Sequence, residues 1–181
     1  MKAFISTLLA SIAIATPALA APLPADHKQF LNTMASDGVK VYINEPAEVC
    51  YGGDDKLSGR YAVSESDRYL IVCQDNRKTS EVVAWTDNDL DTIRHEGFHI
   101  LQDCMAGANN DMKFDTVFVN HDEVIDALGV SETMEVIEIY LEAYSGRSDI
   151  SNAIIHEIEA VYAARDYSAT KLNSMYIEYC M

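Results

Sequence analysis

Two histidines and a glutamate in the middle of the chain have the spacing of a metal-binding motif. The string His95-Glu96-Gly97-Phe98-His99 has the form H-E-x-x-H. On a helix, positions i and i+4 lie on one face, so both imidazoles can bind the same metal ion. A glutamate beside the first histidine can then act as general base toward a metal-bound water. The motif predicts His95 and His99 as Zn²⁺ ligands and Glu96 as the catalytic base.

A catalytic zinc site needs a third protein ligand, and a later segment offers two glutamates. Glu157 and Glu159 lie in residues 150–165, which have the apolar periodicity of an amphipathic helix. In helical phase, Glu157 lies inside the apolar arc and Glu159 lies roughly opposite its centre. A carboxylate on a buried face is costly unless it is paired or bound to a metal. We therefore expect Glu157 to be the third ligand, or else part of a buried salt bridge, and Glu159 to be exposed.

Other side chains are weaker candidates for the third ligand. Glu142 lies one turn after Glu138 on another predicted helix. Charged residues with this spacing ordinarily form a solvent-exposed face of the helix. His121 and His156 are more often surface or capping histidines. Gln102 shares the face of the two motif histidines, but it is a poor zinc ligand. We expect Gln102 to support the site by hydrogen bonding.

The elements that must position these residues form a small sheet followed by helices. Strands are predicted at residues 39–43, 59–63, 69–73 and 82–85, the last as an edge strand. Helices are predicted at residues 25–36, 88–105, 122–128, 131–144, 150–165 and 171–179. Thr86 or Asp87 provides the N-cap of the motif helix. The predicted class is α+β, with a small N-terminal antiparallel sheet and then a helical part that carries the motif helix and the later glutamate-bearing helix.

The first residues have the pattern of a signal peptide. Lys2 provides the positive start, an apolar stretch too short to span a bilayer follows, and a small-x-small cleavage pattern ends at Ala20. We expect residues 1–20 to be removed and residues 21–181 to form a single domain. The predicted location is secreted or periplasmic, with no membrane contact after cleavage.

The charge of the chain limits its partners. It has 29 acidic and 13 basic side chains, and its formal net charge is −16. Phosphate backbones and anionic lipids repel such an acidic surface. We therefore do not expect nucleic acid as a partner. A peptide or protein substrate is the partner that we expect. The sequence does not indicate the oligomeric state.

All four cysteines follow the predicted cleavage site. An even number in an exported chain predicts two disulfides, and the wide spacing of the cysteines argues against a cysteine zinc site. Three pairings are possible. Cys50 and Cys73 flank segments that resemble neighbouring strands, which favours Cys50–Cys73 and leaves Cys104–Cys180 to tie the motif helix to the C-terminus.

The H-E-x-x-H motif and the later Glu157-Ile158-Glu159-Ala160 together resemble the gluzincin branch of the zincin metallopeptidases. The resemblance covers about residues 86–105 and 150–165. It implies His95, His99 and Glu157 as Zn²⁺ ligands, Glu96 as base, and peptide hydrolysis as the activity. The longer signature H-E-x-x-H-x-x-Q-D-C also resembles small exported proteins of no assigned activity. In two respects the chain departs from thermolysin-like enzymes: the gap from His99 to Glu157 is longer, and Val161 replaces an aspartate.

The sequence leaves two classes of function open, and also a disulfide-stabilised domain that binds no metal, in which His95 and His99 would point to solvent. The first is a zinc metallopeptidase, in which a tyrosine hydroxyl can stabilise the developing oxyanion. Tyr140, Tyr144 and Tyr162 are the candidates, and the sequence does not distinguish among them. The alternative is a non-catalytic exported binding or inhibitory module on a zincin-like, disulfide-stabilised scaffold.

Overall fold

The computed structural model describes most of the chain after the predicted signal peptide. The described residues are 21–51, 57–64, 67–108, 113–146 and 149–181, so residues 1–20 lie outside them. The strands are β1 (Lys40–Ile43), β2 (Gly59–Ser64) and β3 (Asp67–Val72). The helices are α1 (Ala25–Ser36), α2 (Ala47–Cys50), α3 (Asp87–Met105), α4 (His121–Leu128), α5 (Val130–Ala143), α6 (Ile150–Asp166) and α7 (Ala169–Cys180).

The strands form one three-stranded sheet in the order β1-β3-β2. β2 and β3 pair antiparallel, with Ser64 opposite Asp67 at the hairpin end. β1 pairs parallel with β3, with Lys40 opposite Tyr69. The predicted α+β class is confirmed, but the sheet is mixed rather than antiparallel throughout. The chain passes from β1 through α2 and β2 before it reaches β3. The direction of β1 is therefore set by its pairing with a strand that is not its neighbour along the chain.

The segment Val82–Trp85, predicted as an edge strand, is not a strand. The backbone of Val83 is hydrogen-bonded by a side chain, and the Trp85 N–H donates to the Ala21 carbonyl at 3.3 Å, so neither residue pairs with a strand. The Val83 N–H donates to Gln74 Oε1 at 2.8 Å, and the Val83 carbonyl accepts from Gln74 Nε2 at 3.0 Å. Asn44 Nδ2 donates to the Glu81 carbonyl at 2.9 Å. Once side chains satisfy these backbone groups, pairing with a strand is no longer required.

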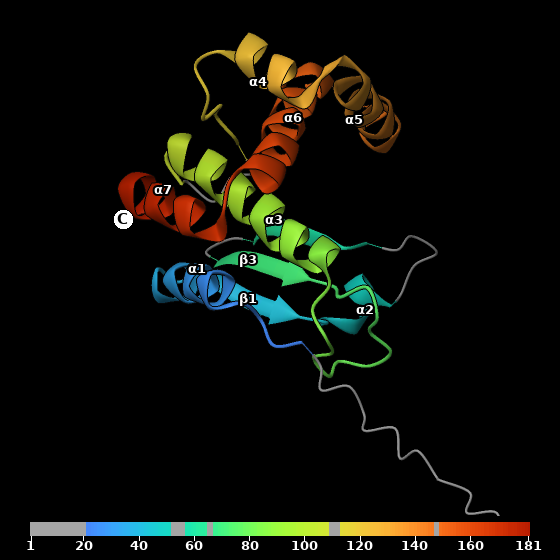
Figure 1. Ribbon diagram of the computed structural model, residues 1–181, viewed down its shortest axis with the longest axis vertical. Helices are drawn as coiled ribbons and strands as arrows, with labels where there is room; N and C mark the ends of the chain where they lie inside the picture. The colour runs from blue at the N-terminus through green and yellow to red at the C-terminus, as the bar shows by residue number, and fades with distance from the viewer. Residues whose placement is uncertain (1–20, 52–56, 65–66, 109–112, 147–148) are drawn as a thin grey trace, which may run out of the picture.

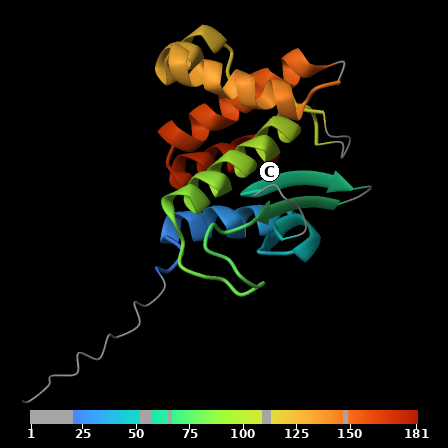
Figure 2. The ribbon, with the colours of Figure 1, turned by 90° about the vertical axis from the view of Figure 1, so that its right-hand side faces the viewer.

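Helix α3, which carries the motif, lies at the centre of the molecule between the sheet and α6 (Figures 1 and 2). Its first turn is fixed by a capping box, in which Thr86 Oγ1 accepts from the Asp89 N–H and the Asp89 carboxylate accepts from the Thr86 N–H. α4 and α5 pack on the other side of α6, farthest from the sheet. The main core around α3 contains Phe30, Met34, Leu70, Ile93, Phe98, Leu101, Ala160, Leu172 and Tyr176.

Two disulfides connect these elements, with the predicted pairings. Cys50–Cys73 joins α2 to the end of β3, and Cys104–Cys180 joins the last turn of α3 to the last turn of α7. Two disulfides are typical of proteins in an oxidising environment. Within the described residues, no helix combines the length and the apolar character needed to cross a membrane.

Gly97 of α3 lies directly against the side chain of Phe30 of α1, and we expect Gly97→Ala to destabilise the fold. A Cβ at this position would lie 2.6 Å from Cε1 and 2.7 Å from Cζ of the fully buried Phe30 ring. Overpacking a core lowers the free energy of unfolding by about 1–3 kcal/mol. Replacing glycine by alanine within a helix raises it by about 1 kcal/mol. Denaturant unfolding should therefore show a lower free energy of unfolding. With Phe30→Leu as background the loss should shrink or reverse, and an equal loss in both backgrounds would refute the explanation.

Candidate metal centre

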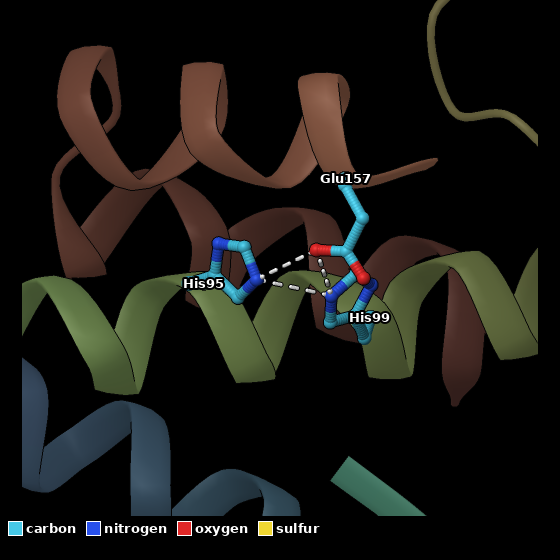
Figure 3. A group of neighbouring side chains, drawn as sticks. All are labelled: His95, His99 and Glu157. Atoms are coloured by element: carbon cyan, nitrogen blue, oxygen red, sulfur yellow. Dashed lines mark hydrogen bonds and ion pairs between the residues drawn. The ribbon is translucent and has the colours of Figure 1, made fainter. Parts of the chain in front are cut away.

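His95 and His99 of α3 and Glu157 of α6 meet where the two helices pack together (Figure 3). The two histidine Nε2 atoms are 3.1 Å apart. Glu157 Oε2 lies 3.2 Å from His95 Nε2 and 3.3 Å from His99 Nε2. Within the described residues, this is the one group of His, Cys, Asp or Glu whose ligand atoms gather so closely, all within 4.8 Å of one another. Such a group can hold a metal ion, and we refer to it as the triad.

The surroundings of the triad favour a cation between the three side chains. Glu157 Oε1 accepts a hydrogen bond from the Tyr144 hydroxyl at 2.5 Å. Glu157 Oε2 is buried, and it contacts the two histidine Nε2 atoms without a well-formed hydrogen bond to any of the described residues. A buried carboxylate oxygen with no well-formed hydrogen bond is costly unless a positive charge compensates it. Two imidazole nitrogens and one carboxylate oxygen are a ligand set that zinc uses in catalytic sites.

The opposite charges of Glu157 and the two histidines stabilise one another. Burial by itself lowers the pKa of His99, but the nearby Glu157 carboxylate outweighs burial and raises this pKa to about 9. Burial by itself raises the pKa of Glu157, but His99 and His95 outweigh it and hold the pKa far below the ordinary carboxyl range. The carboxylate therefore stays ionised and attracts positive charge to this position. A metal ion bound at His99 Nε2 would take the place of a proton on that nitrogen.

His99 is held in place from two sides. Its Nδ1 lies 2.7 Å from Gln102 Oε1, as expected for a supporting hydrogen bond from this residue. Its ring stacks on Phe114, with 5.4 Å between centroids and 11° between the planes. Phe114 lies in the segment after α3, where no periodic pattern identifies it as part of the site. Both contacts restrict the orientation of the His99 ring.

Glu96, the predicted base, contacts the edge strand β2. Its Oε2 accepts a hydrogen bond from the backbone N–H of Tyr61 at 2.6 Å. The Tyr61 hydroxyl donates to Asp103 Oδ2 at 2.8 Å, so one strand residue contacts two separate turns of α3. A Cβ on Gly59 would lie 2.4 Å from Thr92 Cγ2 and 3.0 Å from Glu96 Cγ. The glycine therefore allows β2 to approach the helix beside Glu96.

A pocket of about 590 Å³ opens beside His95 and Glu96. Its walls come from the segment that begins β2, the first half of α3, and helices α5 and α6. The apolar part of its lining consists of Leu57, Ile139, Tyr140, Val161 and Ala164. A pocket of this size next to the triad, lined by both polar and apolar side chains, is suited to a side chain of a bound substrate.

The three candidate tyrosines have different surroundings. Tyr140 lines the pocket, and burial together with the Glu157 carboxylate raises its pKa far above the ordinary tyrosine value. Its hydroxyl therefore stays neutral and can donate. Tyr144 donates to Glu157 Oε1. Tyr162 packs edge-on against Phe118 and Tyr167.

The remaining ligand candidates do not join the triad. Glu142 is exposed on α5, and His156 packs edge-on against Phe114. His121 Nε2 lies 3.1 Å from Glu159 Oε1. The expectation that Glu159 is exposed is wrong, because this side chain is fully buried. α6 packs against α3 on one side, and the segment that contains residues 117 and 118 covers Glu159, so a single apolar arc does not define the buried surface of α6.

Comparisons with known proteins do not assign the chain to a family. No protein-family model, curated protein or solved structure matches it. The function must therefore be inferred from the chemistry of the site.

Proposed function

We propose that this protein is a zinc-dependent metallopeptidase of the gluzincin type, secreted or periplasmic. His95, His99 and Glu157 would hold the zinc ion, and Glu96 would act as general base. The observation that carries the proposal is the convergence of two Nε2 atoms and Glu157 Oε2 within 4.8 Å. The H-E-x-x-H spacing and the adjoining pocket support it.

In the proposed reaction, this chain supplies the base, a hydroxyl donor and the binding surface. Zinc, when bound, polarises the substrate carbonyl and lowers the pKa of a water toward about 7. Glu96 takes a proton from that water as its oxygen bonds to the carbonyl carbon. Glu96 then gives the proton to the amide nitrogen as the carbon–nitrogen bond breaks. Because the Tyr61 N–H holds one oxygen of Glu96, the other oxygen is left to accept the proton.

Tyr140 is the hydroxyl that we expect to stabilise the oxyanion. Tyr140→Phe should lower kcat by about 10²-fold or more, since loss of one oxyanion donor typically costs that much. Zinc content measured with excess Zn²⁺ should stay at the wild-type level, because the three side chains of the triad are unchanged. Steady-state kinetics on a fluorogenic peptide measures the effect. Tyr162→Phe is the matched control, and equal kcat values for Tyr140→Phe and the wild type would rule out this role.

The activity can be tested on the purified protein with a mixture of unstructured peptides. We expect cleavage products in the mass spectrum, their loss after a chelator is added, and their return with added Zn²⁺. A protein that binds one zinc ion per chain but cleaves no peptide would contradict the peptidase proposal. That result would support the alternative, a non-catalytic binding or inhibitory module built on the same metal site.

A further inference from the structure

Glu159 is a fully buried carboxylate with four hydrogen-bonding neighbours among the residues that the structure describes. Its Oε2 accepts from Gln102 Nε2 at 3.0 Å and from the Val117 N–H at 3.1 Å. Its Oε1 accepts from the Phe118 N–H and lies near His121 Nε2, both at 3.1 Å. Each oxygen faces at least one backbone N–H, which can only donate. Glu159 is therefore an acceptor on both oxygens.

This arrangement determines the orientation of the Gln102 amide. Gln102 Nε2 lies 3.0 Å from Glu159 Oε2 and 3.0 Å from the His156 carbonyl oxygen. Both neighbours accept, so both amide protons are directed at them. Gln102 Oε1 is then left to face His99 Nδ1, at 2.7 Å. Since Oε1 can only accept, His99 Nδ1 must carry the proton of this hydrogen bond.

We infer that Glu159 is a positioning residue, which acts through Gln102 to select the His99 nitrogen that binds the metal. With the proton on Nδ1, the lone pair of Nε2 is free, and Nε2 is the atom that faces His95 and Glu157. The hydrogen bond on one ring nitrogen fixes the role of the other in metal sites. This inference rests on the proposed function, because it requires a metal at the triad.

Glu159→Gln is the direct test, since it changes one acceptor oxygen into a donor with little change in shape. When the new amide nitrogen faces Gln102, it favours a turned-over Gln102 amide, which gives up its hydrogen bond to the His156 carbonyl and presents its own nitrogen to His99 Nδ1. The proton then moves to His99 Nε2, and it must leave that nitrogen before a metal can bind. We expect a loss of zinc affinity of about 10–100-fold, the usual effect of changing an outer partner of a metal ligand.

A second variant covers the case in which Glu159→Gln fails to fold. Gln102→Leu removes the connecting amide but leaves the other three neighbours of Glu159 in place. It should lose zinc affinity to a similar extent. His121→Ala is the matched control, because His121 contacts Glu159 but lies outside the path to His99. Its zinc affinity should match that of the wild type.

A rescue experiment distinguishes the positioning role of Glu159 from a purely structural role. Adding Gln102→Glu to Glu159→Gln returns an acceptor to His99 Nδ1, but it restores neither backbone contact of Glu159. We expect partial recovery of zinc affinity, and ¹⁵N spectra of the zinc-loaded protein should show zinc on His99 Nε2. Affinity that does not recover would assign Glu159 a structural role and contradict the inference.

The zinc measurements separate this inference from the proposed function. Zinc affinity is obtained by competition with a chelating dye. Wild-type affinity in both Glu159→Gln and Gln102→Leu would overturn the positioning role and leave the metal site standing. Absence of zinc binding by the wild type would overturn the proposed function, and the positioning role with it.

Discussion

Glu96→Gln is expected to lower peptide hydrolysis by about 10²–10⁴-fold, the usual contribution of a general base, while zinc stays bound. The amide oxygen can still accept from the Tyr61 N–H, so the contact between α3 and β2 survives. The amide cannot take a proton from water at neutral pH. Glu96 also lies outside the triad, so the metal ligands are unchanged. The measurements are kcat/KM on a fluorogenic peptide and zinc per chain by plasma mass spectrometry.

Glu132→Gln is the matched control for this experiment. Glu132 lines the same pocket but forms an ion pair with Arg165 and has no part in the proposed proton transfer. Its kcat/KM should stay close to the wild-type value. Hydrolysis by Glu96→Gln at the rate of the Glu132 variant would show that Glu96 is not the base.

Glu157→Gln is expected to lower zinc affinity by more than about 100-fold, the upper range for residues that only support a ligand. The amide oxygen can still accept from the Tyr144 hydroxyl. The amide nitrogen then faces His95 and His99 and has no lone pair for a metal. The site is left with two protein ligands, whereas a catalytic zinc site uses three. Competition with a chelating dye measures the change.

The control for Glu157→Gln is Glu142→Gln, which alters the exposed glutamate that the sequence also offered as a ligand. Its zinc affinity should equal that of the wild type. If both variants bind zinc as tightly as the wild type, Glu157 is not a ligand. If the Glu142 variant alone loses zinc, the third ligand has been assigned to the wrong helix.

The parts of the molecule that depend on local sequence could be predicted. The motif helix begins where Thr86 and Asp89 form a capping box, a pattern readable from two residues three apart. The phase of Ile150–Asp166 placed Glu157 on the buried face, and Glu157 does lie beside both motif histidines. Local patterns succeed here because cap and periodicity are set by residues within one or two turns.

The parts that depend on distant contacts could not be predicted. The parallel direction of β1 follows from its pairing with β3, which no local pattern encodes. Val82–Trp85 has strand-like residues, but Gln74 from earlier in the chain binds its backbone. Glu159 is buried because the backbone N–H groups of Val117 and Phe118 reach it from another segment. In each case, the deciding partner lies outside the segment itself, at least nine residues away along the sequence.

The metal content of the purified protein tests the central claim most directly. After incubation with Zn²⁺ and removal of the excess by gel filtration, plasma mass spectrometry gives the zinc per chain. The account predicts one zinc ion per wild-type chain and a large loss in the His95→Ala, His99→Ala and Glu157→Gln variants. Zinc near zero in a folded wild-type protein, or one zinc ion retained in all three variants, would contradict it.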